Sequence, residues 1–260
     1  MEIDRLLLIL ATLAFAGGLV HAMVAIKAGT WKKSSWHLLP MVTGFILQTA
    51  FLYLRGQDVG RCPLTNLFEV LIFICWSIVL LYFLVGSTYR LSLLGVFTAP
   101  LVGSIQIIGL VLPIDRAPSS ELASRPVNSI LELHAAISLI AYAAFALACT
   151  TGVMYLLQER LLKKHRIGGL FYQLPPIQGL ARAIQRLALL GFVLLSAGLG
   201  LSFGLDASAS NPKLIFAWLV WGLYALICFF MWRHVLSPRQ TAWLAVIGFA
   251  LPFFSLWIVT

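Results

Sequence analysis

The chain has 260 residues, of which 61% are hydrophobic and only 10% are charged. A soluble domain carries roughly 25% charged residues, so this composition predicts an integral membrane protein and excludes a soluble catalytic domain. The formal net charge of +9 would be typical of a nucleic-acid-binding protein if its distribution were ignored. The basic residues lie in short stretches between apolar runs, where they set the orientation of membrane proteins. We therefore expect the lipid bilayer, and no nucleic acid, as the partner of these charges.

The apolar runs define the predicted spans. A helix needs roughly 20 residues to cross about 30 Å of hydrocarbon. Each span must be helical because hydrocarbon offers no hydrogen-bond partner to a free backbone group. The sequence predicts an all-α integral membrane protein, a bundle of eight transmembrane helices in one domain over residues 1–260. The spans lie at about 6–26, 37–54, 67–86, 91–112, 131–157, 187–205, 214–232 and 242–259. Pro40, Pro100 and Pro252 fall within spans and should bend them.

The orientation follows from the Lys and Arg residues on the two sides of the predicted bundle. Of the 18 residues of these types, twelve lie in one alternating set of connections and six in the other. This count predicts that both termini face outward and that the basic loop 158–186 is the main cytoplasmic feature. Its LLKKH and ARAIQR stretches are either plain topology charge or short helices on anionic headgroups. The first run, 6–26, follows no basic segment and precedes no small-residue cleavage site, so it should stay as a span.

Few motifs point to chemistry. Cys62, Cys75, Cys149 and Cys228 are scattered singly, which does not favour a zinc or thioredoxin-type site. The sequence has no HExxH, phosphate-loop or nucleophile-elbow motif, so we expect no enzyme activity. Asn66 and Glu69 have the spacing of a helix N-cap with its reciprocal carboxylate. A capping role explains Glu69 without any ligand.

His134 is the most informative histidine. It lies about one turn below the outer end of the fifth predicted span, and Ser138 and Tyr142 share its helix face. A lone helical histidine is often a satisfied core residue, yet imidazole is also the commonest metal ligand. Trp218 and Trp221 enter the seventh span from the same side; an interfacial aromatic belt is the alternative for them. The other histidines, His21, His37, His165 and His234, lie near predicted cytoplasmic ends or loops.

Two motifs carry a family resemblance. GRCPLTNLFEVLIFICWS (60–77) resembles the PLSNLYESLxFLSW segment of the cytochrome c assembly proteins, the CcsA/ResC haem-handling membrane family with its HemX-type relatives. LHAAISLIAYAAFALACTTGVMYLLQER (133–160) resembles the external-histidine span of that family, and 184–204 resembles its next helix. The resemblance covers the chain from about residue 36 to the end.

The resemblance implies binding of haem b and its presentation at the outer face for attachment to apocytochrome c. His134 occupies the position of the first external haem-ligand histidine. The chain departs from the family at three places. LDASASNPK (205–213) stands where the tryptophan-rich WWD loop is expected, Phe229 stands at the intramembrane histidine, and the second external histidine falls at Thr260. The pattern that remains is similar to the compact HemX-type branch.

The leading hypothesis is a haem-binding protein of the bacterial inner membrane that acts as a binding or export factor. Arginines on the outer side, among them Arg55 and Arg125, have the bidentate geometry that propionates need; solvated loop charge is their alternative. The partners expected are haem and other cytochrome c assembly proteins or a tetrapyrrole-synthesis enzyme. The residues predicted for the site are His134 as the axial iron ligand, with Trp221, Trp218, Glu69, Trp76, Arg55 and Arg125.

Two other functions stay open. The main alternative is a non-catalytic regulator or scaffold for a tetrapyrrole-synthesis or respiratory protein, acting through 158–186 without bound haem. A transporter for another substrate is a third possibility, but the scarcity of charge inside the spans argues against ion coupling.

Overall fold

The structure is a computed structural model that describes residues 2–28, 38–89, 94–112, 127–164, 175–202 and 212–259. In these ranges all regular elements are α-helices. Six of them are long and apolar enough to cross a membrane: α1 (Glu2–Lys27), α3 (Leu67–Tyr89), α4 (Leu94–Val111), α6 (Ser129–Lys163), α8 (Ile177–Ser202) and α9 (Pro212–Trp232). α2 (Leu39–Val59) occupies the second predicted span, and α10 (Pro238–Gly248) with α11 (Ala250–Val259) occupies the eighth. The all-α, multi-pass class is confirmed; the number of crossings and the orientation stay predictions.

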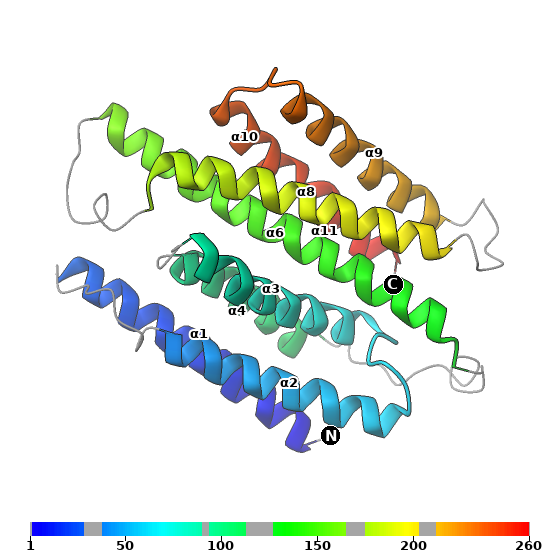
Figure 1. The fold of residues 1–260 in the computed structure, drawn as a ribbon. Helices are drawn as coiled ribbons and strands as arrows, with labels where there is room; N and C mark the ends of the chain where they lie inside the picture. Colours follow the sequence, from blue (N-terminus) through cyan, green and yellow to red (C-terminus); the bar gives the residue numbers. More distant parts are fainter. Residues whose placement is uncertain are drawn as a thin grey trace.

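The helices form two groups that meet at α6. α1 and α2 lie together on one side, α3 and α4 lie between them and α6, and α8 to α11 lie on the other side (Figure 1). α6 packs most extensively on α8 and also contacts α3, α4 and α10. α6 is therefore the helix that joins the two groups.

Small residues let α6 approach its neighbours closely. Five alanines of α6 are fully buried, at positions 141, 143, 144, 146 and 148. A Cβ added to Gly198 of α8 would lie 2.5 Å from Ser138 Oγ, and one added to Gly152 of α6 would lie 2.9 Å from the carbonyl oxygen of Ala242. Small residues at helix crossings bring backbones together in membranes, where apolar area alone gives little driving force.

The helix ends at the basic loop are longer than predicted. α6 continues to Lys163, and α8 already begins at Ile177. The LLKK and ARAIQR stretches are thus the ends of two long helices, and the connection between them is 164–176 rather than 158–186. Glu159 stabilises the extension of α6 by pairing with Lys163 at 2.8 Å and with Arg239 of α10 at 3.4 Å.

The three prolines inside predicted spans act differently. Pro40 lies in the first turn of α2, where its missing N–H has no helical partner to lose. Pro100 lies inside α4. Pro252 cannot donate to the carbonyl of Gly248, and α10 ends at Gly248 before α11 begins at Ala250. The bend predicted there is a break between two helices.

Candidate functional site

The junction between α2 and α3 begins with a left-handed residue. Gly60, with φ +69°, ends α2, and residues 61–66 lead into α3. The side chain of Asn66 accepts a hydrogen bond of 2.8 Å from the N–H of Glu69, which confirms the predicted cap. The Glu69 carboxylate accepts from both the N–H and the hydroxyl of Thr65 at 2.8 Å. The reciprocal bond thus reaches one residue earlier than the capping pattern predicts.

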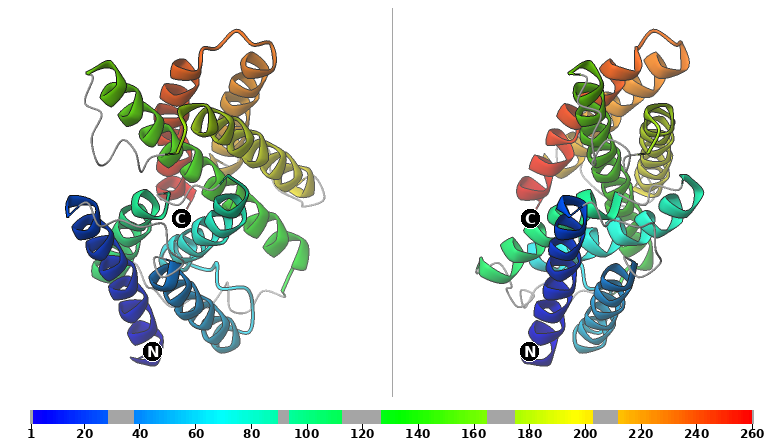
Figure 2. Two further views of the ribbon diagram at one scale, coloured as in Figure 1. Left: turned by 60° about the vertical axis from the view of Figure 1, so that its left-hand side comes forward. Right: turned by 90° about the vertical axis from the view of Figure 1, so that its left-hand side faces the viewer.

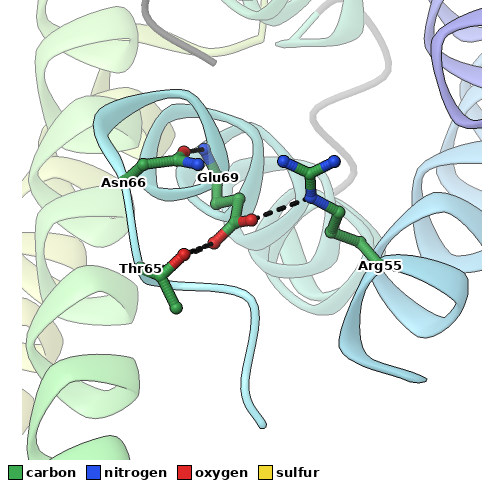
Figure 3. A network of polar contacts seen from close by, with 4 residues as sticks. All are labelled: Arg55, Thr65, Asn66 and Glu69. Atoms are coloured by element: carbon green, nitrogen blue, oxygen red, sulfur yellow. Dashed lines mark hydrogen bonds and ion pairs between the residues drawn. The ribbon is translucent and has the colours of Figure 1, made fainter. Parts of the chain in front are cut away.

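Glu69 also holds a buried ion pair. Arg55 Nε, near the end of α2, donates to Glu69 Oε1 at 2.9 Å (Figure 3). Glu69 is 0% exposed and Arg55 is 8% exposed. Burying two charges is costly, and the geometry must supply further hydrogen bonds to offset that penalty. Thr65 supplies such bonds, so Glu69 joins α2, the junction and the first turn of α3.

The imidazole of His134 is oriented by the backbone of α8. Its Nδ1 lies 2.7 Å from the carbonyl oxygen of Gly198. A carbonyl only accepts, so Nδ1 carries the proton and Nε2 keeps its lone pair. Histidines that ligate metals are held in this way, with the other ring nitrogen donating to a carbonyl or carboxylate. α6 itself begins one turn earlier, where the Asn128 side chain caps it by accepting from the N–H groups of Ile130 and Leu131.

The face that His134 shares with Ser138 and Tyr142 is directed into the bundle. Ser138 lies against Gly198, and the Tyr142 hydroxyl accepts from the Ser255 hydroxyl of α11 at 3.1 Å. The shared face expected from the spacing therefore meets α8 at one end and α11 further along.

Trp221 contacts the same part of α8 from α9. Its Nε1 donates to Ser196 Oγ at 2.9 Å, and its ring lies 5.7 Å from that of Phe192 and 5.6 Å from that of Trp218. Ser196 is two residues from Gly198, or about 3 Å along the helix axis. His134 and Trp221 therefore lie at the same depth. Trp218 is 42% exposed, which fits a place in an interfacial belt.

Trp76 belongs to a different interface. Its Nε1 donates to Thr49 Oγ1 of α2 at 2.8 Å, and its ring stacks on Phe45 at 5.6 Å. These contacts place Trp76 between α2 and α3, whereas His134 lies between α6 and α8. The contacts that the structure gives for described residues do not bring the two side chains together. Arg125 lies outside the described residues.

Cys62 connects the α2–α3 junction electrostatically with the start of α6. Burial raises the pKa of its thiol, and the carboxylates of Glu132 and Glu69 raise it further. Glu132 lies two residues before His134, so the junction is within electrostatic reach of the helix that carries the histidine. Across the described ranges, His, Cys, Asp and Glu side chains do not gather in groups of three or more that could hold a metal ion.

The sequence-based site therefore falls into separate groups. His134, Trp221 and Trp218 surround one end of α8, while Arg55, Glu69 and Trp76 lie between α2 and α3. Gly198 was missed, and Arg55 was expected to bind a propionate rather than to pair with Glu69. Gly198 carries no functional side chain to notice. Arg55 gave a weak signal, since a basic residue ending one span and an acid opening the next lie on the same side of the membrane.

Comparisons with known proteins agree on one family. The family described as Cytochrome C assembly protein matches residues 64–260, which takes in α3 to α11 and leaves out α1 and α2. Protein HemX of Brevibacillus brevis is 30% identical over 193 residues, which are 72% of this chain and 70% of that protein. Cytochrome c biogenesis protein CcsA of Synechococcus sp. strain JA-2-3B'a(2-13) is 33% identical over 132 residues, 50% of this chain and 38% of that protein.

Protein HemX of Bacillus subtilis strain 168 is 30% identical over 142 residues, 55% of this chain and 49% of that protein. The match thus spans less than half of this second HemX protein and of the CcsA protein. Both Glu69 and His134 fall within the family match. The chain belongs to the cytochrome c assembly protein family and is a member of its HemX-type branch.

Proposed function

We propose that this protein binds haem b at the end of α6 and α8 that holds His134, with Nε2 of that residue as the axial ligand to iron. It handles or presents the haem at the outer face of the bacterial inner membrane for cytochrome c maturation, without catalysing the attachment. The observation that carries this proposal is the 2.7 Å contact between His134 Nδ1 and the Gly198 carbonyl. It directs the proton to Nδ1 and leaves Nε2 for a metal.

The donor set fits haem better than a bare metal ion. One imidazole suffices as a protein ligand when the porphyrin supplies four nitrogens and apolar contacts hold the macrocycle. Trp221, Trp218 and Phe192 form an aromatic group at the depth of His134, and aromatic rings are suited to a flat apolar ligand. When bound, haem supplies the iron porphyrin that a cytochrome c carries.

The remaining predicted site residues divide between two roles. Arg55 is already neutralised by Glu69, so we assign this pair, with Trp76, to holding α2 on α3. Arg125 is retained as the candidate partner of a propionate, because an arginine fork matches a carboxylate.

The optical spectrum of the protein purified in detergent tests the proposal. The wild type should show a Soret band at near-stoichiometric haem, and His134→Ala should lose the haem or become high spin. Added imidazole should partly restore the variant's spectrum. His21→Ala is the matched control, since this histidine is exposed on α1. Equal haem content in wild type and His134→Ala would remove the ligand assignment.

A second candidate function is regulation of a tetrapyrrole-synthesis or respiratory protein without bound haem. It is favoured by the fixed end of α6, where Glu159 pairs with Lys163 and with Arg239 of α10. These ion pairs form a charged surface at the predicted cytoplasmic side. A haem-free wild type that co-purifies with such a protein, and loses it on Lys163→Glu substitution, would support regulation over haem handling.

A further inference from the structure

Four helices on one side of the molecule form a closed ring. α1 packs on α2 and α4, and α3 packs on the same two helices; Figure 2 shows this group from two further directions. α2 and α4 therefore stand at opposite corners. Side chains that both helices direct inward meet on the axis of the ring.

One layer of this ring is a fully apolar cluster. Leu8, Phe51, Phe68 and Ile72 are buried together, and Leu110 packs against them. These residues come from all four helices, so the cluster crosses the axis.

The direction of α2 follows from its bonds to α3. Thr49 bonds to Trp76 near the middle of α3, whereas Arg55 bonds to Glu69 in the first turn of that helix. Moving forward along α2 thus means moving backward along α3. The two helices are antiparallel.

α4 is antiparallel to α3 as well. Cys75 Sγ contacts the carbonyl oxygen of Val102 at 3.6 Å, and Phe68 lies against Gly109. Phe68 precedes Cys75 on α3, whereas its neighbour Gly109 follows Val102 on α4, so the two helices run in opposite directions. α2 and α4 are therefore parallel, and one turn backward leads in the same direction along both.

Two carboxamides occupy the layer next to the apolar cluster. Gln48 precedes Phe51 by three residues on α2, and Gln106 precedes Leu110 by four residues on α4. Both are 0% exposed. The amide nitrogen and oxygen of each have no hydrogen-bond partner. Buried polar groups are almost always hydrogen-bonded, so four unpaired atoms in one layer call for a ligand.

We propose that Gln48 and Gln106 enclose an internal water site on the axis of the ring. Carboxamides donate and accept and carry no charge, which matches a neutral ligand that does both. A buried water makes about two to four hydrogen bonds, and the four unpaired atoms of the two amides include both donors and acceptors for them. The ligand must be small because the adjacent layer is filled by large side chains. Ala11 lies between Leu8 and Phe15 on α1 and leaves only a methyl group at this level.

Side-chain amide NMR tests for the water directly. The full-length protein is labelled with ¹⁵N-glutamine in detergent, and the two NH₂ signals are assigned by their loss in Gln48→Leu and Gln106→Leu. Both should show cross-relaxation with a long-lived water, whereas Gln57, exposed on α2, should show only fast exchange. Cross-peaks between the two amides without any to water would overturn the proposal in favour of a direct bond.

Thermal unfolding of the single and double variants gives a second, independent readout. If water bridges the amides, each single Leu variant should melt at a lower temperature, because the other amide loses its bridge. The decrease in melting temperature of the double variant should be smaller than the sum of the decreases of the two single variants. If both single variants melt higher and their shifts add, the amides are simply unpaired and no water is bound. Gln57→Leu is the control and should leave the melting temperature unchanged.

Discussion

Arg55 Nε and Glu69 Oε1, 2.9 Å apart, join two parts of the chain that differ in their family match. Arg55 lies before residue 64, where the match to the cytochrome c assembly family begins, and Glu69 lies just after it. This pair is therefore a buried polar link between α2 and the family core, beside the hydrogen bond of Thr49 to Trp76, whereas α1 packs directly on α4. Because both groups are buried, we expect this pair to affect the stability of the protein rather than its surface charge.

Glu69→Gln should destabilise the protein strongly. The amide carries no charge to pair with that of Arg55, and removing one partner of a buried ion pair typically costs about 3–5 kcal/mol. The double variant Arg55→Met with Glu69→Leu should recover much of this loss, because no charge then remains buried. The free energy or temperature of unfolding in detergent measures both effects. A single variant as stable as the wild type would show that Glu69 only caps α3.

Gly198→Ala should loosen the contact between α6 and α8. The new Cβ would lie 2.5 Å from Ser138 Oγ, and overpacking of this kind typically costs about 1–3 kcal/mol. The spectrum of bound haem should change together with stability, since the same residue supplies the carbonyl that holds His134.

Ser138→Ala in the Gly198→Ala background removes the clashing hydroxyl and should restore stability. Gly200→Ala is the control, because no atom lies within 4 Å of its added Cβ. A haem spectrum unaffected by Gly198→Ala would show that the orientation of His134 does not depend on the contact between α6 and α8.

Cys62 should react slowly with thiol reagents at neutral pH. Burial and the carboxylates of Glu132 and Glu69 raise its pKa, and the thiolate is the reactive form. Glu132→Gln removes one negative neighbour, so the pKa should fall and alkylation at a fixed pH should become faster. The rate against pH, with Cys75, Cys149 and Cys228 replaced by Ala, measures the shift. An unchanged titration midpoint would mean that Glu132 does not contribute to the raised pKa.

The orientation rests on the unequal distribution of Lys and Arg and is tested by labelling. In a background without native cysteines, Val127→Cys precedes α6 and Lys164→Cys follows it, and both positions are exposed. An impermeant maleimide added to intact cells should label the first and not the second. The opposite pattern would place His134 on the cytoplasmic side.

The helices were predictable because an apolar run long enough for the bilayer has one stable solution, a helix. Their ends were less so. The charged end of α6 reads as a loop in the sequence, yet Glu159 and Lys163 lie one turn apart and pair along the helix, which favours its continuation. The sequence predicts a bend at Pro252, where the structure has a break between two helices. Proline removes the backbone hydrogen bond to the residue four positions earlier in a bend and in a break alike.

The site was predictable where its contacts are local. Asn66 and Glu69 are three residues apart, so the cap can be recognised in the sequence. His134 and Gly198 are 64 residues apart, and the acceptor is a backbone oxygen, which no side-chain pattern records. The contacts of Trp76 with Thr49 and Phe45 of α2 could not be predicted for a related reason: helical spacing shows which residues share a face, but not which helix that face meets.

The length of α6 gives it a mechanical property. It runs unbroken from Ser129 to Lys163 without an internal proline, and 25 residues separate His134 from Glu159, which is about 38 Å at 1.5 Å per residue. Such a helix tilts or turns as a rod. Because the helix is continuous, a change in the tilt of α6 would shift His134 and the ion pair of Glu159 with Arg239 together.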